Sequence, residues 1–276
     1  MVLFGSILKP KHLLKALLVV LGSFNCLSLL TLLRRPRAFW RLSQEMFAAF
    51  NKNVRNDPIP ESTMFEILGR EMENVQIDLF VDQEPTISFG ELMSICVLTR
   101  LINPKNVLEI GTFRGVTTYH IAKNSDRSCR IYTMDLPDDY RAVEAINEVQ
   151  RGGKAVTDLY LIDGRPRSEE LCYVGTDVEH KITQISCDST TYDYDKNFTE
   201  KFDLIFIDGS HEYEHVKIDS ANAFKWSADG GVVLWHDYGL PVEITRGVKR
   251  HLRELRKIRD IRRLSGTSLC IFRKSE

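Results

Sequence analysis

The stretch that decides the fold covers residues 107–115 and reads Val-Leu-Glu-Ile-Gly-Thr-Phe-Arg-Gly. It is an apolar run that passes through Glu109 and ends in a turn bracketed by Gly111 and Gly115. Glycine tolerates the backbone angles and close approaches that such a turn requires. A buried strand, a glycine turn and the start of a helix together are typical of a nucleotide-type ligand site, because the amide groups at the helix N-terminus face the ligand. Phe113 stands where the dinucleotide fingerprint requires glycine, which weakens a dehydrogenase interpretation.

Two further acids follow predicted strands. The segment 130–136 predicts a strand that contains Asp135, about one β-α-β unit after Gly111. A carboxylate there can accept hydrogen bonds from both hydroxyls of a ribose. Asp188 follows the alternating run 181–187 and is a second candidate for the same ligand. Both assignments depend on the glycine turn that precedes them, because an isolated Asp at a strand end is more often a cap or turn residue.

Two later strands end in polar clusters. The run Phe-Asp-Leu-Ile-Phe-Ile at 202–207 is followed by Asp208-Gly-Ser-His211, and the strand 232–235 is followed by His236-Asp237-Tyr238. The carboxyl ends of parallel strands meet at one edge of a sheet, so we expect Asp208 and Asp237 to converge there. Hard oxygen ligands in a cleft are suited to Mg²⁺.

In this order, these motifs resemble those of the class I S-adenosylmethionine-dependent methyltransferases. They are most similar to the metal-dependent O-methyltransferase group that includes macrocin O-methyltransferase, with cephalosporin hydroxylase-like proteins as relatives. The resemblance covers roughly residues 85–272. It implies that Asp208 and Asp237 hold a metal ion and that His211 is the general base. It also implies a set of cofactor-binding positions, namely Glu109, Gly111, Thr112, Gly115, Asp135, Asp188 and Asp208.

The metal site departs from the pattern of these relatives. They carry a third side-chain ligand as Glu before the second metal Asp or as Asn after it, whereas this chain has His236 before and Tyr238 after Asp237. Histidine binds divalent metals but is a softer ligand than Mg²⁺ prefers. The sequence therefore leaves three alternatives for the ion: water completes its coordination, it is a different ion, or it is absent. His236 is a metal ligand, a hydrogen-bonding partner of the site, or a packing residue.

The composition argues against several other classes of protein. The chain has 276 residues, is 43% hydrophobic and has a formal net charge of −1, which argues against a nucleic-acid partner. The basic run 251–263 has apolar residues at helical spacing, which predicts a solvated helix face. The six cysteines form no Cys-x-x-Cys pair, which argues against structural zinc and a disulfide framework and favours the reducing cytoplasm.

The apolar segment from Leu13 to Leu33 is flanked by basic residues and lies at the edge of the length that spans a bilayer. A secretory signal is rejected, because no small-residue cleavage site follows and the cofactor is made inside cells. Three alternatives remain: a single-pass anchor, a helix in the cytoplasmic membrane interface, or a helical arm packed on the catalytic domain or a second subunit. The expected location is the cytoplasm, either free or attached to the cytoplasmic face of a membrane.

We predict three regions: a helical segment 1–50, a linker with helices 51–87, and a methyltransferase domain 88–276. The linker should contain a short helix capped by Ser62, and the domain should begin with a helix at 89–101. Its fold should be a Rossmann-like, mostly parallel seven-strand sheet with helices on both faces. The long segment 137–175, which includes Arg165 and Arg167, is expected to contribute to the acceptor site.

The predicted function is O-methylation of a hydroxyl on a small molecule or a glycan, with His211 as base and Mg²⁺ as an optional cofactor. The predicted partners are this acceptor, a membrane contacted through the Leu13 to Leu33 segment, and a second copy of the chain. The alternatives are a hydroxylase-like metal-dependent enzyme on the same fold and a non-catalytic membrane-recruitment module.

Overall fold

The computed structural model describes residues 59–69, 74–78, 87–138, 140, 165–239 and 245–275. All of them belong to one compact unit, Pro58–Glu276. The N-terminal segment with Leu13 to Leu33 lies outside the described residues, as does 141–164 of the predicted acceptor segment. In the part of the chain that is described, none of the helices combines the length and the apolar character that crossing a bilayer requires.

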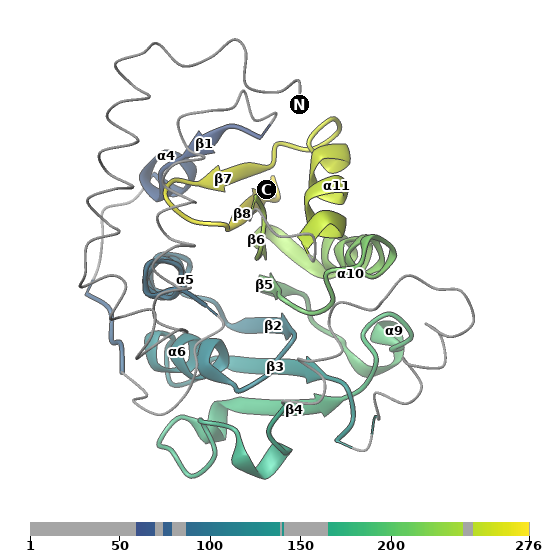
Figure 1. Cartoon of the computed structure of the whole chain (residues 1–276). Coiled ribbons are helices and arrows are strands. Elements are labelled where there is room, and N and C mark those ends of the chain that lie inside the picture. Colours follow the sequence, from purple (N-terminus) through teal and green to yellow (C-terminus); the bar gives the residue numbers. More distant parts are fainter. Residues whose placement is uncertain are drawn as a thin grey trace, which may run out of the picture. The chain divides into compact units, whose positions relative to one another are not determined.

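The centre of the unit is an eight-stranded sheet with the order β1-β7-β8-β6-β5-β2-β3-β4 (Figure 1). Only β8 runs antiparallel to its neighbours, β6 and β7. The strands are β1 Glu61–Ser62, β2 Asn106–Ile110, β3 Arg130–Asp135, β4 Ile182–Ser186, β5 Phe202–Ile207, β6 Ser227–Trp235, β7 Arg262–Leu264 and β8 Cys270–Arg273. The mostly parallel sheet with flanking helices confirms the predicted fold class.

The eighth strand is a correction to the predicted seven. Ser62 was expected to cap a short helix, but it lies in β1, which pairs in parallel with β7 through Glu61–Arg263 and Ser62–Leu264. The helix α4, Met64–Leu68, is capped one residue later by Thr63. The Thr63 hydroxyl accepts from the Glu66 amide, and the Glu66 carboxylate accepts from the Thr63 amide. Either residue type caps helices, so only the pairing with β7 decides between them.

Helices cover both faces of the sheet (Figure 1). The helices α5, Phe89–Ile102, and α6, Val116–Asn124, lie on one face, and α9, Tyr194–Asn197, α10, Tyr213–Trp226, and α11, Arg246–Leu255, lie on the other. Alternate side chains of β5 pack on opposite faces of the sheet. Leu204 and Phe206 pack with the α5–α6 core, whereas Ile205 and Ile207 pack with the α10–α11 core. This alternation is the two-residue period of a strand that is buried on both faces. Two short 3₁₀ helices, Ser168–Glu170 and Glu179–Lys181, precede β4.

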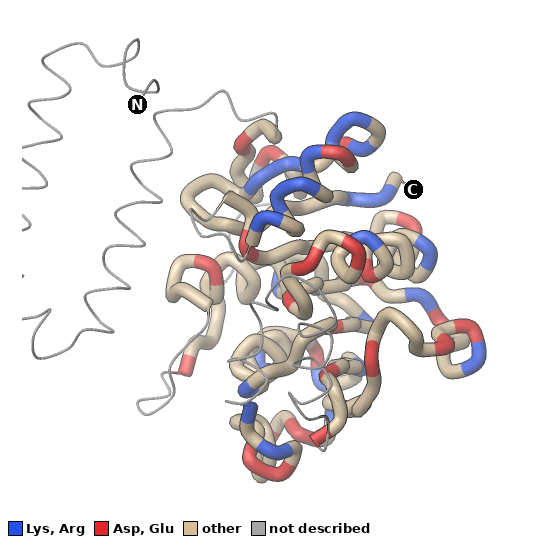
Figure 2. Tube along the Cα trace, turned by 45° about the vertical axis from the view of Figure 1, so that its right-hand side comes forward, with Lys and Arg blue, Asp and Glu red and all other residues tan. Residues whose placement is uncertain are grey.

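Two local predictions are wrong. A strand was expected at 232–235, but β6 begins at Ser227 and continues through Gly230 and Gly231. Its register to β5 shifts between the pairs Phe202–Ser227 and Leu204–Val232, so the glycines form an irregularity inside the strand. The basic helix ends at Leu255 and does not continue to 263, although Lys and Arg residues are concentrated in this part of the fold, near the C-terminus (Figure 2). The side chain of Ile258, expected on its apolar face, is 75% exposed.

The topology gathers the predicted functional residues at one edge. The chain enters the sheet centre at β2, moves outward through β3 and β4, and returns to β5 and β6 on the other side of β2. The carboxyl ends of these five parallel strands lie at the same edge, and the β2–β5 boundary is the topological switch point where open α/β sheets bind ligands.

Candidate active site

The glycine turn after β2 packs directly against the loop after β5. Gly111 has a φ of +100°, and a Cβ atom there would lie 2.2 Å from the backbone oxygen of Asp208. Gly115 has a φ of +74° and is the N-cap of α6, and a Cβ atom there would lie 2.8 Å from the Tyr173 ring. Both predicted glycines are therefore required by backbone angle and by close packing. They place the N-terminus of α6 at the switch point.

Glu109 lies below this turn with none of its surface exposed. Its Oε2 atom accepts from the Thr118 hydroxyl and, at 2.5 Å, from the Thr133 hydroxyl. Thr133 is in turn 2.6 Å from the hydroxyl of Thr112, which accepts from Gln184 Nε2. Burial raises the pKa of Glu109 to about 8, against the effect of the two threonine hydrogen bonds. The described contacts of Glu109 are thus with the residues that support the turn.

Asp135 lies at the end of β3, as predicted. Its Oδ2 atom accepts from the Phe113 amide at 2.7 Å, which ties it to the glycine turn. Its Oδ1 atom accepts from the Leu136 amide and from the Arg165 guanidinium, both at 2.8 Å. Arg165, in the segment expected to contribute to the acceptor site, contacts Asp135 and the carbonyls of Leu136 and Pro137. A ribose hydroxyl at Oδ1 would take the place of the guanidinium.

Asp188 lies two residues beyond the end of β4, at the same edge of the sheet. Its Oδ1 atom accepts from the amide and the hydroxyl of Thr190, at 2.8 and 2.6 Å. The next residue, Ser189, donates to the buried carboxylate of Asp219 in α10 at 2.8 Å. These bonds fix the turn after β4, so Asp188 is held in place at the end of the row of strands that carries Gly111 and Asp135.

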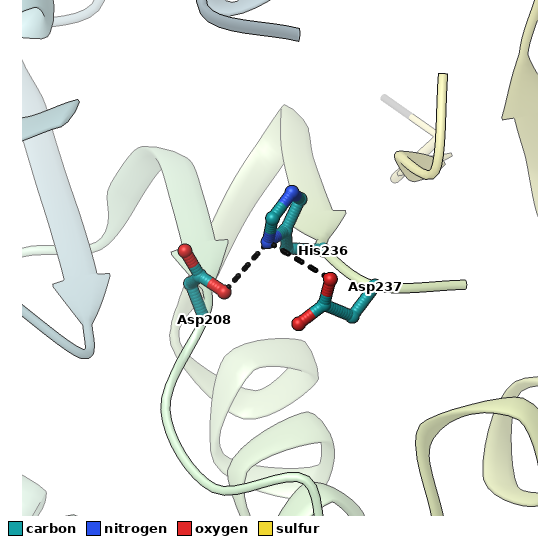
Figure 3. A group of neighbouring side chains, drawn as sticks. All are labelled: Asp208, His236 and Asp237. Atoms are coloured by element: carbon teal, nitrogen blue, oxygen red, sulfur yellow. Dashed lines mark hydrogen bonds and ion pairs between the residues drawn. The ribbon is translucent and has the colours of Figure 1, made fainter. Parts of the chain in front are cut away.

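The second half of the edge holds Asp208, His236 and Asp237. One ligand atom from each lies within 4.8 Å of the other two. Both carboxylates converge on the same ring nitrogen of His236 (Figure 3): Nδ1 is 2.9 Å from Asp208 Oδ1 and 3.5 Å from Asp237 Oδ1. Asp237 reaches this position with a φ of +63°, an uncommon angle for a residue other than glycine. The predicted meeting of the two acids therefore occurs, with His236 between them.

His211 joins this cluster from the loop between β5 and α10. Its Nε2 atom lies 2.5 Å from Asp237 Oδ2. Asp237 thus directs one oxygen to His211 and the other to His236. All four residues line the same small hollow between the ends of β5 and β6 and the helices α10 and α11.

Glu91 is the partner that the sequence did not reveal. It belongs to α5 and lies 3.3 Å, through Oε2, from the Nε2 atom of His236. The same oxygen accepts from the amide and hydroxyl of Ser88, as part of the capping box of α5. Its Oε1 atom accepts from the amide and hydroxyl of Ser268, at 2.7 and 2.6 Å. The Ser-x-x-Glu pattern indicates the cap, but nothing local indicates a contact with a residue 145 positions away.

Tyr238, the other departure from the relatives, points away from the cluster. Its side chain is 1% exposed and belongs to the α10–α11 core. Its hydroxyl accepts from Arg253 Nε at 3.4 Å. Of the two residues that flank Asp237, only His236 therefore faces the other acid.

Burial and mutual charge shift the pKa values of the residues in this cluster. Burial alone would lower the pKa of His236, but the charges of Asp208 and Asp237 outweigh it and raise that pKa well above the usual value. Burial raises the pKa of Asp208. For Asp237, the His236 charge and the His211 hydrogen bond outweigh burial and lower the pKa. For Glu91, the contacts with His236 and Ser268 likewise outweigh burial and hold the pKa well below its usual range.

The donor set fits a divalent cation. Two carboxylate oxygens and one imidazole nitrogen face a common point, and the remaining nitrogen of the imidazole faces a carboxylate, as in many metal-bound histidines. Three carboxylates in one buried cluster also favour a positive charge at its centre.

Residues 108–238 match the profile of a family described as a methyltransferase domain. The matched span begins one residue before Glu109 and ends one residue after Asp237, so it contains every predicted site residue, the strands β3 to β6 and the last three residues of β2. The chain carries an S-adenosylmethionine-dependent methyltransferase domain. Glu91 lies outside the matched span.

Solved structures similar to the methyltransferase chain are distant in sequence. The O-methyltransferase TomG from Streptomyces achromogenes is 19% identical, with 69% of this chain and 82% of that chain covered and a TM-score of 0.44. An O-methyltransferase from Bacillus cereus is 18% identical, with 69% and 84% covered and a TM-score of 0.42. The methyltransferase PaMTH1 from Podospora anserina is 12% identical, with 99% and 100% covered and a TM-score of 0.46. No curated protein matches the chain.

Proposed function

We propose that the chain transfers a methyl group from S-adenosylmethionine to a hydroxyl of a small molecule or a glycan, with His211 as general base. The observation that carries the proposal is the 2.5 Å contact between His211 Nε2 and Asp237 Oδ2 at the switch-point edge. A histidine held by a carboxylate in this way is the usual arrangement for removing a proton at neutral pH.

The tautomer follows from that contact. When Nε2–H donates to Asp237, the basic lone pair of the neutral ring lies on Nδ1. The proton of the acceptor hydroxyl moves to Nδ1, and the negative Asp237 stabilises the imidazolium that forms. Bound S-adenosylmethionine would supply the methyl group, which the deprotonated acceptor oxygen would take from the sulfur.

Sulfonium chemistry supplies the electrophilic methyl group, so the residues of the chain need to bind and orient the cofactor. The turn of Gly111, Thr112 and Gly115 would lie against the cofactor at the N-terminus of α6, with Asp135 at its ribose hydroxyls and Asp188 near its adenine. Glu109 would act by supporting the turn through Thr118 and Thr133.

Asp208, His236 and Asp237 would hold a divalent cation beside His211. Such an ion lowers the pKa of an oxygen bound to it, as it does for water. Asp237 would then hold His211 through Oδ2 and bind the ion through Oδ1. Attachment to the cytoplasmic face of a membrane and homo-oligomerisation stay predictions from sequence.

The proposal is tested with the full-length chain. Calorimetric titration with S-adenosylmethionine should show saturable binding that Asp135→Ala removes. Transfer of a labelled methyl group is then measured against a panel of phenols, sugars, glycosides and amines. His211→Ala should lower kcat by about 10²- to 10⁴-fold while S-adenosylmethionine binding is retained.

The matched control is His215→Ala. His215 lies in the first turn of α10, just beyond the loop that carries His211, with a half-exposed side chain and an ion pair with Glu212 at 4.0 Å. We expect kcat within a factor of about two of the parent for this surface position. Absence of cofactor binding, or product formed only on nitrogen acceptors, would overturn the proposal.

A further inference from the structure

The contacts that hold the His236 ring indicate which kind of ion the site prefers. Its two ring nitrogens face opposite sides of the site: Nδ1 faces Asp208 and Asp237, and Nε2 faces Glu91. Figure 3 shows both aspartates directed at Nδ1 from the ends of β5 and β6. In this arrangement the position between the three ligand atoms is taken by the Nδ1 proton. An ion that replaces the proton meets two oxygens and one nitrogen.

The separations between these atoms suit one ion. Ligands about 2.1 Å from a metal lie about 3.0 Å apart along an octahedral edge and about 3.4 Å apart along a tetrahedral edge. The observed separations from His236 Nδ1 are 2.9 Å to Asp208 Oδ1 and 3.5 Å to Asp237 Oδ1. Both separations are therefore close to those of ligands that share one metal ion.

Glu91 prevents the ring from turning away. Four hydrogen bonds from Ser88 and Ser268 hold both of its oxygens, and its side chain is 10% exposed. A carboxylate fixed in this way accepts a hydrogen bond from Nε2–H of His236 and leaves the Nδ1 lone pair for the metal. Ser88 is the N-cap of α5 and Ser268 precedes β8, so the α5 side of the sheet positions a ligand that directly follows β6.

We propose that Asp208, His236 and Asp237 bind a transition ion in the Fe²⁺, Co²⁺ or Zn²⁺ class in preference to Mg²⁺, and that Glu91 is the positioning residue for His236. The inference rests on the proposed function only for the place of the ion beside His211. Imidazole favours these ions, whereas Mg²⁺ prefers oxygen ligands and retains its waters.

The test measures ion binding to the full-length chain without S-adenosylmethionine or acceptor. Co²⁺ is the probe, because its visible absorption reports nitrogen ligation, and Mg²⁺ is titrated by calorimetry. The wild type should bind Co²⁺ at least 100-fold more tightly than Mg²⁺. His236→Asn, which offers an oxygen, should reduce Co²⁺ affinity 10- to 100-fold and shift the absorption band while changing Mg²⁺ affinity less than threefold.

Glu91→Gln tests the positioning role. It should weaken Co²⁺ binding 10- to 100-fold, the usual effect of removing such a partner. Asp219→Asn removes a buried carboxylate whose described bond is to Ser189, and it should leave Co²⁺ affinity unchanged. Circular dichroism establishes that each variant is folded. The preference for Co²⁺ over Mg²⁺ is measured on the wild type alone, so it does not depend on the folding of any variant.

Equal wild-type affinity for Mg²⁺ and Co²⁺, absence of binding of either ion, or unchanged Co²⁺ affinity in folded Glu91→Gln would overturn the inference. These outcomes are distinct from failure of the proposed function. If S-adenosylmethionine binds and methyl transfer proceeds, the function stands whichever ion is preferred. If the cofactor does not bind while Co²⁺ does, the function fails and the ion site remains.

Discussion

Gly247 of α11 lies directly against the backbone of His211: a Cβ atom on Gly247 would be 2.2 Å from the carbonyl oxygen of His211. It would also be 2.4 Å from the amide nitrogen of Tyr213. Backbone atoms cannot move aside as a flexible side chain can, so this helix fixes the loop that carries the proposed base. The position of His211 therefore depends on α11 as well as on β5.

Gly247→Ala should displace His211 and lower kcat at least 10-fold, because misplacement of a catalytic group by about 1 Å costs as much as 10²-fold. Cofactor binding should change little, since the glycine turn is on the other side of β5. Gly90→Ala is the matched control: it is also helical, has no atom within 4 Å of the added Cβ, and should be neutral or slightly stabilising. Wild-type kcat in Gly247→Ala would contradict the prediction.

Gly111→Ala should destabilise the fold by about 3 kcal/mol or more, because it combines backbone strain with a 2.2 Å contact to the Asp208 carbonyl. Gly266→Ala separates the two effects. Gly266 has a φ of +80° with nothing within 4 Å, so its cost should be about 1 kcal/mol of strain alone. Denaturant unfolding of both variants measures the difference. Equal losses of stability would show that the Asp208 contact relaxes freely.

Arg165→Ala should strengthen S-adenosylmethionine binding about fivefold, because the guanidinium 2.8 Å from Asp135 competes with a ribose hydroxyl for the same oxygen. Removing a positive charge beside a sulfonium acts in the same direction. Arg167→Ala, whose side chain is 74% exposed and paired with Glu169, should have no effect. Weaker binding in Arg165→Ala would mean that the arginine orients Asp135 for the cofactor.

Glu109 should make the fold less stable as the pH rises. Burial raises its pKa from 4.5 to about 8, so between these values the folded state holds a proton that the unfolded state has released. The contribution is fully present below pH 4.5, falls by about 1.4 kcal/mol per pH unit above it, and is lost as the pH passes about 8. Glu109→Gln should remove this slope, as measured by urea unfolding at several pH values.

Asp219→Asn provides the comparison for Glu109. Burial raises the pKa of Asp219 to about 6, so its effect on the slope should end near that pH. Between pH 6.5 and 8 only Glu109→Gln should flatten the curve. An unchanged slope in that interval would show that Glu109 is already ionised in the folded chain.

The sequence determined the elements that form the sheet and their functional ends. Strands buried on both faces are near-continuous apolar runs, which predicted β2 and β5 within a residue or two, whereas β4 at the sheet edge was predicted from its alternating pattern. Parallel pairing then brings Asp135, Asp208 and Asp237 to one edge. The pattern failed where apolar residues lie outside regular structure: Ile258 fits a helical period, but α11 has already ended.

Only the tertiary structure decided which polar groups meet. Nothing local distinguishes His236 from Tyr238 as the residue that faces Asp208, and nothing local pairs Glu91 with His236 or Arg165 with Asp135. A hydrophobic pattern predicts that a residue is buried, because the tendency to be buried depends mainly on the residue's own side chain. The partner of a buried polar group depends on how separate elements pack, and that information lies in the whole sequence and in no single stretch of it.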